Sequence, residues 1–396
     1  MADPGCQLRC AVSGTDEVGG PLAGVTVVDM STSYAGPTAA MYLADLGARV
    51  IKVERPGHGD DARSWGPPFV DGVSAWFASA NRNKDSIVVD LRAAHGRAEL
   101  DGLLEAADVL VENLNPTKLA GLGLDPDTLR RRFPKLVYCA VSGFGLTGPD
   151  AGLAGYDLIA QARSGLMSVT GPAGGPPQRV STALSDVVAG MCAALAVSAA
   201  LVRQRTTGQG ELVDVSLLDV GLALMAPRLA AYLAGGPEPA PSGGTDSVLA
   251  TYQTFPTADR DIAVAIGNDA MWRRFCSVVE LGALADDPGL ATNADRQARR
   301  PELIAAISVR LARRPATEWT AALQAAAIPC SLVQSLSEVV QDPHVRARGA
   351  LMPVPGSSGR LHTVQPPFRL GSQSQPRNER FPDMDSLRAD TEAVRS

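Results

Sequence analysis

Short runs of β-branched and other apolar residues alternate with longer stretches of helical spacing through the first half of the chain. Strands are expected at 22–30, 48–54, 86–90, 107–113, 136–142 and 212–216. Helices are expected at 36–47, 93–107, 125–133, 155–170, 182–206 and 217–234. Continuous apolar runs are typical of strands buried on both faces, and their alternation with helices is typical of parallel sheets. The pattern therefore predicts an α/β fold, with a large domain built on an open, doubly wound, Rossmann-like parallel sheet.

The second half of the chain has a different pattern. Gly and Pro are concentrated in 235–247, two short strands of hairpin type follow, and amphipathic helices are expected at 269–281, 301–313 and 316–326. This predicts a smaller α+β domain after a linker. We expect a loose N-terminal extension at 1–20, a large α/β domain at 21–234, a Gly/Pro linker at 235–247 and a small α+β domain at 248–326. The remaining residues, 327–396, are expected to return to the large domain and pack on it.

Composition narrows the class of protein. The 396 residues are 45% hydrophobic and 20% charged, which excludes a disordered polyelectrolyte. The formal net charge of −6 and an aromatic content of 5% argue against a nucleic-acid partner. The longest apolar stretch, 187–202, is shorter than the roughly 20 residues that span a bilayer, so we expect a buried helix and no membrane partner.

The number and spacing of the cysteines and histidines bear on metal binding and on the cellular compartment. The six cysteines are scattered, and the four histidines form no cluster of metal-ligand spacing. The N-terminus has no apolar run of the signal-peptide type. We therefore expect a cytoplasmic protein with reduced thiols and no bound metal.

Polar or Gly-rich residues follow successive predicted strands. The carboxyl ends of parallel strands lie at one edge of a sheet, where ligands bind. Neither G-x-G-x-x-G nor a Walker A sequence is present, so a dinucleotide is not expected. A ligand with phosphates, a polar head and a long body suits this row of donors. The strand ends concerned are 30–37, 52–55, 90–92, 112–113 and 142–145.

Asp186 is the strongest candidate for chemistry, at the start of the apolar helix in the segment Ala183-Leu184-Ser185-Asp186. Its position alone favours the role of a first-turn aspartate that is stabilised by the helix dipole, worth about 1 kcal/mol, over a catalytic role. The spacing leaves the catalytic role open as the less favoured alternative.

The chain resembles the class III CoA-transferases, the family of formyl-CoA transferase and carnitine CoA-transferase, together with the related 2-methylacyl-CoA racemases. The resemblance extends from about residue 21 to about residue 372 and includes many blocks in the family's order. Among them are LAGVTVVDMSTSYAGP, LADLGARVIKVERPGHGDDAR, NRNKDSIVVDLR, ADVLVENLNP, SGFGLTGP, GYDLIAQARSGLMSVTG and ALSDVVAGMCAALA.

The resemblance implies a role for each candidate. It implies that Asp186 is the nucleophile, which attacks an acyl-CoA thioester to give a mixed anhydride and then an aspartyl-CoA thioester. It implies acyl-CoA and a carboxylic acid as substrates, with no prosthetic group and no metal. The CoA-contacting positions that it implies are Tyr34, Ala35, Arg55, Val89, Asp90, Leu91, Arg92, Asn113 and Leu114, with Ser142, Gly143, Phe144 and Gly145 at the thioester end.

Three positions depart from patterns in the family. Gly121 and Ser142 stand where formyl-CoA transferase has an arginine and a lysine, which bears on how CoA phosphates are held. The racemase branch has Gly-His-Asp where this chain has Gly155-Tyr156-Asp157, and tyrosine is a poor base near pH 7. A CoA-transferase is therefore the leading hypothesis, and a racemase or an inactive acyl-CoA-binding protein is the alternative.

Assembly and shielding of the site are also implied by the resemblance. Family members form interlocked homodimers, so a homodimer is expected here. Gly243-Gly244 corresponds either to a mobile loop that shields the intermediate from water or to a plain linker.

Overall fold

The computed structural model describes residues 19–371 and 381–386, and these form two compact units. The predicted N-terminal extension lies outside the described residues, apart from its last two. Unit 1 contains residues up to Met167, Arg179–Pro237 and the chain from Arg346, whereas unit 2 contains Ser168–Gln178 and Glu238–Val345.

Unit 1 is built on a six-stranded sheet in which every neighbouring pair of strands is parallel. Across the sheet the order is β5-β2-β1-β6-β7-β8, so the order reverses between β1 and β6. In such sheets the crevice at the carboxyl ends of the two strands at this switch point is the usual ligand site. The strands are β1 Thr26–Asp29, β2 Arg49–Glu54, β5 Lys84–Val88, β6 Val109–Glu112, β7 Val137–Ser142 and β8 Leu212–Ser216.

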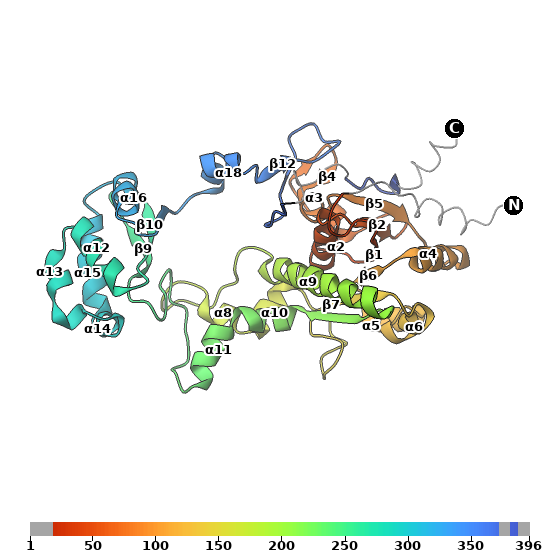
Figure 1. Ribbon diagram of the computed structural model, residues 1–396, viewed down its shortest axis with the longest axis horizontal. Coiled ribbons are helices and arrows are strands. Elements are labelled where there is room, and N and C mark those ends of the chain that lie inside the picture. The colour runs from red at the N-terminus through yellow and green to blue at the C-terminus, as the bar shows by residue number, and fades with distance from the viewer. Residues whose placement is uncertain (1–18, 372–380, 387–396) are drawn as a thin grey trace. The chain divides into compact units, whose positions relative to one another are not determined.

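Helices cover both faces of the sheet, as the continuous apolar strands predicted (Figure 1). Alternate residues of one strand enter opposite cores: Val27 packs with α2 and α9, whereas Val28 packs with α4, α5 and α6. The first face carries α2 Ala35–Asp45, α7 Asp157–Arg163, α9 Leu184–Thr207 and α10 Leu217–Leu224; the second carries α4 Ala94–Ala106, α5 Pro116–Leu122 and α6 Pro126–Arg132.

Two predicted helices are each broken in two. The helix expected at 155–170 is α7 followed by α8 Leu166–Val169, because Gly165 adopts a φ of +83° between them. The helix expected at 217–234 is α10 followed by α11 Ala226–Leu233, and Pro227 lies in the first turn of α11. Proline lacks the N–H that would continue the hydrogen-bond ladder, which explains the break.

The C-terminal segment covers the open edge of the sheet at β5. Asp385 Oδ1 accepts the N–H of Val88 at 2.9 Å, and Ser386 Oγ accepts the N–H of Ser86 at 3.0 Å. An edge strand leaves such donors unpaired, so these side chains protect it. Smaller elements of unit 1 are η1 Asp61–Ser64, β3 Phe69–Val70, β4 Val73–Ser74, α3 Ala75–Ala80, β12 Leu351–Pro353 and β13 His362–Val364.

Unit 2 is a three-stranded antiparallel sheet, β11-β10-β9, packed against helices around its own core. Because β11 pairs with β10, the chain stays in this unit beyond 327, where we expected it to return to the large domain. Its elements are β9 Tyr252–Pro256, β10 Asp261–Ala265, α12 Asp269–Val278, α13 Gly282–Asp286, η2 Pro288–Leu290, α14 Asn293–Ala298, α15 Arg300–Leu311, α16 Ala316–Ala325, β11 Cys330–Leu332 and α17 Leu336–Val339, followed by α18 Pro343–Ala347 at the boundary.

Among the described residues, α9 is the one helix whose length and apolar composition would also suit a membrane span. It packs along α2 and supplies Ala189, Ala193 and Val197 to the core on that face of the sheet. These contacts are those of a core helix in a folded domain.

Candidate active site

A cavity of about 200 Å³ lies in unit 1 at the carboxyl ends of the central strands. Segments that are far apart in the sequence meet there: the turn after β1, the chain after β6 and β7, and the start of α9. The lining residues are Thr32–Ala35, Trp65, Asn113–Pro116, Val141–Gly143, Ala151, Leu153–Tyr156, Asp186 and Leu217.

Three helices begin at this cavity, and none has a capping bond from the side chain of its own N-cap residue, although Asp157 accepts the N–H of Ser185 at the start of α9. They are α2, α7 and α9, whose N-cap residues are Tyr34, Tyr156 and Ala183. Free N–H groups at a helix start, together with the helix dipole, favour a negatively charged neighbour. The long α9 brings this environment directly to Asp186 in its first turn.

Asp186 is a partly buried carboxylic acid in an unusual electrostatic position. Burial, together with the negative charge of nearby Asp157, raises its pKa to about 7. A carboxyl group with a pKa near neutrality is a stronger nucleophile when ionised than an ordinary aspartate. The site therefore holds a carboxylate that is half ionised near pH 7.

Asp157 and Gln161, on α7, hold the segment that leads into Asp186. Asp157 Oδ1 accepts the N–H of Ser185 at 2.8 Å, and its Oδ2 accepts Gln161 Nε2 at 2.7 Å. Gln161 Oε1 accepts the N–H of Val180 at 2.9 Å. Both side chains are buried, so they fix the start of α9 from the protein side.

Close backbone packing at glycine sets the walls of the cavity. A Cβ atom on Gly143 would lie 2.6 Å from the Cα of Gly155, so the turn after β7 contacts the chain just before Tyr156. A Cβ atom on Gly190 would lie 2.7 Å from Thr38 and 3.0 Å from the carbonyl of Ala35. The second turn of α9 therefore lies against the first turn of α2.

A cluster of aromatic side chains lies along one side of the cavity. The rings of Tyr34 and Trp76 meet edge to face with centroids 5.4 Å apart, and Trp65 packs against Trp76 at 6.2 Å. Ser79 Oγ donates to the hydroxyl of Tyr34 at 3.1 Å. These contacts hold Tyr34 and Trp65 beside the ligand space.

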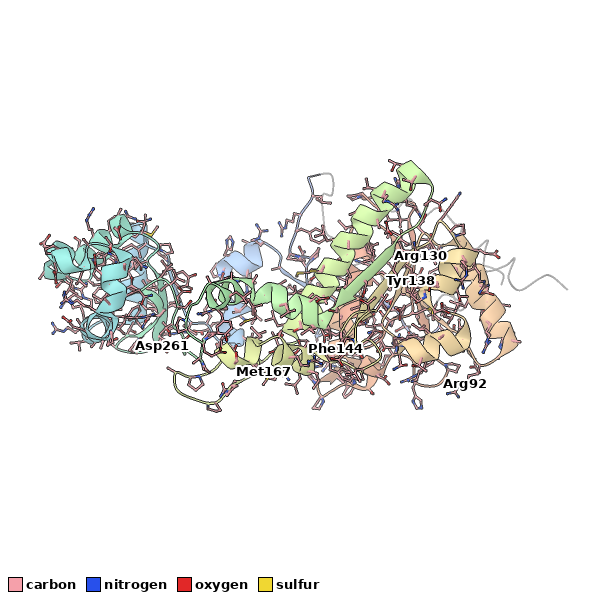
Figure 2. The ribbon with its side chains drawn as sticks, turned by 90° about the horizontal axis from the view of Figure 1, so that it is seen from below. Arg92, Arg130, Tyr138, Phe144, Met167 and Asp261 are labelled. Carbon is pink, nitrogen blue, oxygen red and sulfur yellow. The ribbon has the colours of Figure 1, made fainter. Side chains whose placement is uncertain are left out.

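Six of the residues expected to contact CoA line this cavity together with the expected nucleophile, and the other expected contacts do not. Arg55 pairs with Asp61, Val89 is in the core, and Arg92 is exposed and lies well apart from Phe144 (Figure 2). Asp90, Leu91, Phe144 and Gly145 are also outside the lining. The seven that the fold brings together are Tyr34, Ala35, Asn113, Leu114, Ser142, Gly143 and Asp186.

Sequence reasoning missed several residues of the cavity. Trp65 comes from a loop without periodic pattern, and Leu153 and Ala154 come from a Gly-rich segment, so no local signal marked them. Tyr156 was singled out only as a departure from the racemases, yet it lines the cavity and is 63% exposed. The Gly-Tyr-Asp start of α7 was the signal that could have identified Asp157.

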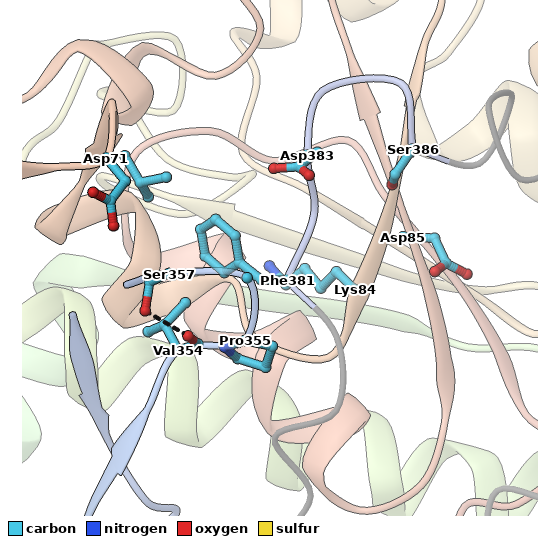
Figure 3. A pocket seen from close by; sticks show the side chains of 11 residues that line it. Asp71, Lys84, Asp85, Val354, Pro355, Ser357, Phe381, Asp383 and Ser386 are labelled. Atoms are coloured by element: carbon cyan, nitrogen blue, oxygen red, sulfur yellow. Dashed lines mark hydrogen bonds between the residues drawn. The ribbon is translucent and has the colours of Figure 1, made fainter. Parts of the chain in front are cut away.

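Two further cavities lie in unit 1. One, of about 450 Å³, is formed by the C-terminal segment and the loop at Val354–Ser357, and Lys84 is among its lining residues (Figure 3). The other, of about 210 Å³, is lined by leucines with Arg97, Asp101 and Arg132. Within the described parts of the chain, no group of three or more His, Cys, Asp or Glu side chains could hold a metal ion.

The Gly243-Gly244 segment lies in unit 2. The N–H of Gly243 donates to the carbonyl of Gly171 at 2.9 Å, and a Cβ atom on Gly244 would lie 2.5 Å from Thr254 Oγ1. This segment is therefore packed within its own unit.

Comparison with known proteins gives a consistent result. The model of the family described as CoA-transferase family III matches residues 22–386. The chain is 40% identical over 369 residues to the succinate–glutarate CoA-transferase of Agrobacterium fabrum, covering 91% of this chain and 92% of that protein. It is 37% identical to the acetyl-CoA:oxalate CoA-transferase of Acetobacter aceti, covering 90% of this chain and 91% of that protein. Among solved structures it is similar to a CAIB/BAIF family protein from Brucella suis, with a TM-score of 0.83, 34% identity, and coverage of 95% and 100% of the two chains.

Proposed function

The chain belongs to CoA-transferase family III, and on that premise we propose that it transfers CoA from an acyl-CoA to a carboxylic acid through covalent intermediates on Asp186. The observation that carries this proposal is the position of Asp186, whose partly buried carboxylate lines the cavity at the switch point of the sheet.

The proposed reaction exchanges carboxylates and thiolates and needs no oxidant, metal or ATP. The Asp186 carboxylate attacks the thioester carbonyl, the C–S bond breaks, and CoA thiolate leaves a mixed anhydride. The thiolate then attacks the aspartyl carbonyl, which forms the aspartyl-CoA thioester and releases the donor acid as its carboxylate. The acceptor carboxylate attacks this thioester to give a second anhydride, and the thiolate attacks the acceptor's carbonyl. The new acyl-CoA leaves and Asp186 is regenerated as a carboxylate.

The surroundings of Asp186 suit this chemistry. The reaction develops negative charge on a thiolate, a carboxylate and tetrahedral oxyanions, and α2 begins at the cavity with no side chain capping its first N–H groups. The walls at Ser142 and Gly143 add further polar groups at the same place. Preorganised donors of this kind stabilise charge that develops during the reaction.

We propose short dicarboxylic acids as the acyl groups, because the relatives named above are succinate–glutarate and acetyl-CoA:oxalate CoA-transferases. The described lining contains hydroxyl, amide and indole groups but neither lysine nor arginine. Recognition of a second carboxylate by unit 1 therefore relies on neutral donors such as Thr32, Tyr34 and Tyr156. A cavity of this size suits a short acid better than a long chain.

The nucleotide part of CoA is proposed to extend toward Leu91 and Arg92. Leu91 lines the cavity of about 210 Å³ that also contains Arg97 and Arg132. Guanidinium groups bind phosphates well. Arg97 and Arg132 therefore supply, on this side of the sheet, the positive charge that Gly121 does not provide. Arg55, which pairs with Asp61 here, would exchange that partner for a phosphate.

The racemase alternative needs a base on each face of the substrate's α-carbon. Tyr156 stands where that branch has its histidine, and none of the four histidines, all within the described residues, lines the cavity. The transferase is therefore preferred.

We also propose a homodimer, interlocked as the family resemblance implies, and acting in the cytoplasm. The supporting observation is an apolar stripe on the outer side of α9, where Met191, Leu195 and Val202 are exposed at intervals of about one or two turns. Leu195 is 73% exposed, which is unusual for a leucine on a central helix. A partner subunit would cover this stripe.

Intact-protein mass spectrometry after mixing with succinyl-CoA tests the proposal. We expect wild-type protein to gain a CoA or acyl mass that hydroxylamine removes, and Asp186→Ala to gain none. Glutarate and oxalate should then accept CoA better than acetate does. No adduct on wild-type protein with any donor tested, or an equal adduct on Asp186→Ala, would contradict the assignment of Asp186. Deuterium entry at the α-carbon of 2-methylacyl-CoA would favour the racemase.

A further inference from the structure

The turn Ser31–Ser33, which joins β1 to α2, is held by side chains from three other parts of unit 1. Five of its six backbone N–H and C=O groups have a side-chain partner. The five hydrogen bonds are Ser31 N–H to Asp29 Oδ1 at 3.0 Å, Lys52 Nζ to Ser31 O at 2.9 Å, Thr32 N–H to Asn113 Oδ1 at 2.8 Å, Asn113 Nδ2 to Thr32 O at 2.7 Å, and Ser33 N–H to Asp60 Oδ1 at 2.9 Å. Turns of this length at a surface normally leave most such groups to water.

The Asn113–Thr32 pair spans the switch point of the sheet. Asn113 directly follows β6 and Thr32 lies three residues after β1, and these are the two strands between which the order reverses. Both ends of the Asn113 carboxamide are used by Thr32, so this side chain has one remaining amide hydrogen and one remaining lone pair. Its main bonds therefore join the two sides of the crevice.

A buried ionic cluster supports the turn from below. Lys52 Nζ lies 2.8 Å from Asp60 Oδ2 and 3.8 Å from Asp29 Oδ2, and Lys84 Nζ lies 2.8 Å from Asp29 Oδ2. All four side chains are fully or almost fully buried. Their charges cancel, but hydrophobic residues of similar volume would fill the same space without desolvating charges. Stability alone therefore does not explain why the cluster is present.

The held turn has a strained conformation at the point where it enters α2. Ser33 adopts a φ of +72°, which side-chain-bearing residues rarely adopt and which persists only where neighbouring contacts impose it. A Cβ atom on Gly36 would lie 2.3 Å from the Cβ of Ser31, so the turn also packs tightly on the first turn of α2. The conformation of Ser33 thus sets where Tyr34 and the free N–H groups of α2 point.

We propose that Asn113, Asp60 and Lys52 are positioning residues that hold the Ser31–Ser33 turn, and thereby the start of α2, against the cavity that contains Asp186. Asn113 acts through Thr32 in this arrangement, and its principal role is not a contact to CoA. The catalytic consequence rests on the proposed function, whereas the structural consequence for the turn does not.

The test compares Asn113→Ala with a matched control, Asn293→Ala. Asn293 also bonds backbone through both ends of its carboxamide, at 2.8 Å to Val248 O and 3.1 Å to the N–H of Ala250, but it lies in unit 2. Hydrogen–deuterium exchange of the full-length protein should show peptides covering Ser31–Tyr34 exchanging at least about tenfold faster in Asn113→Ala and unchanged in Asn293→Ala. This readout needs no enzymatic activity, so it separates failure of this inference from failure of the proposed function.

Transfer kinetics give the second readout. In Asn113→Ala we expect kcat to fall about 10- to 100-fold, while the Kd of CoA measured by calorimetry changes less than about threefold. The charge-neutral variant Asp60→Asn/Lys52→Met should give a similar loss, and combining it with Asn113→Ala should cost much less than the product of the two effects, because both release the same turn. A raised Kd with unchanged kcat, multiplicative effects, or unchanged exchange at Ser31–Tyr34 would overturn the proposal.

Discussion

The carboxylate of Asp157 accepts the backbone N–H of Ser185 at 2.8 Å, which places a second negative charge immediately behind Asp186. Asp157 has two effects on its neighbour. Its hydrogen bonds fix the start of α9, and its charge disfavours ionisation of Asp186. Asparagine keeps the Oδ1 acceptor for Ser185 and removes the charge, while its Nδ2 replaces the Oδ2 that accepts from Gln161, so the unfolding free energy of the variant measures the positional effect alongside the electrostatic one.

We predict that Asp157→Asn shifts the pH dependence of CoA transfer. Asp186 is a nucleophile only when ionised, so kcat/KM should rise with pH and level off above about 7 in the wild-type enzyme. Removing the charge of Asp157 lowers the pKa of Asp186, so the rising limb should move to lower pH by about 0.5–1 unit. Glu112 is a useful control, because burial raises its pKa to about 7 as well. The limb should stay in place in Glu112→Gln, and a limb that moves in that variant and not in Asp157→Asn would assign the titration to Glu112.

Asp186→Asn should abolish transfer and stabilise the protein at alkaline pH. The pKa of Asp186 is about 7 in the folded protein and near 3.9 in an unfolded chain, so between these values the folded state holds a proton that the unfolded state has lost. The contribution of Asp186 to the free energy of unfolding therefore decreases as pH rises from about 4 to 7. Asparagine removes this loss, and we expect a gain of about 1–3 kcal/mol at pH 8 that disappears toward pH 4.

Urea unfolding of the two proteins at pH 8 and pH 4.5 measures this difference, and transfer assays should show a loss of at least about 10³-fold. An asparagine variant that is less stable than wild type at pH 8 would show that the carboxylate is favourably paired in solution.

Gly143→Ala should damage the site and the fold together. The added Cβ would lie 2.6 Å from the Cα and 3.0 Å from the backbone N of Gly155, and these backbone atoms have no flexible side chain that could move aside. We expect a loss of about 1–3 kcal/mol in the free energy of unfolding and a fall in kcat as the wall next to Tyr156 moves.

Gly121→Ala is the matched control for Gly143→Ala. Gly121 lies inside α5, and a Cβ atom there would meet nothing within 4 Å, so alanine should stabilise by about 0.5–1 kcal/mol. Thermal unfolding compares the two variants. Equal stability of Gly143→Ala and wild type would show that the two backbone segments are not in contact in solution.

Leu195→Asp should weaken subunit association. An aspartate in the middle of the exposed apolar stripe on α9 would have to be buried by a partner, which costs several kcal/mol for an unpaired charge. Sedimentation at a series of concentrations should give a dimer for wild type and a monomer–dimer mixture for the variant. Val309→Asp, an exposed valine on α15 of unit 2, serves as a control that should remain dimeric. If both variants behave as wild type, the stripe is not the interface.

Much of the large domain could be predicted because the signals are local. A strand buried on both faces must be apolar along its whole length, as in Val137–Ser142, and a helix shows its spacing within a few turns. The polar residues after each strand could likewise be assigned to one edge, because parallel strands share a direction. Asp186, Tyr34, Asn113 and Ser142 were found in this way or through the family blocks, and all four line the cavity.

What only the tertiary structure decided is which of these strand ends meet. Thr32 and Asn113 are 81 residues apart and pair because β1 and β6 are neighbours, whereas Arg92 follows the outermost strand, β5, and does not line the cavity. Trp65 reaches the cavity from an irregular loop. Strand order depends on contacts between distant segments, and residue periodicity reports only which face of its own element a side chain occupies. The sequence by itself therefore determined the elements, the edge that carries the chemistry and the candidate nucleophile, and the packing of β1 against β6 and of α2 against α9 decided the site around it.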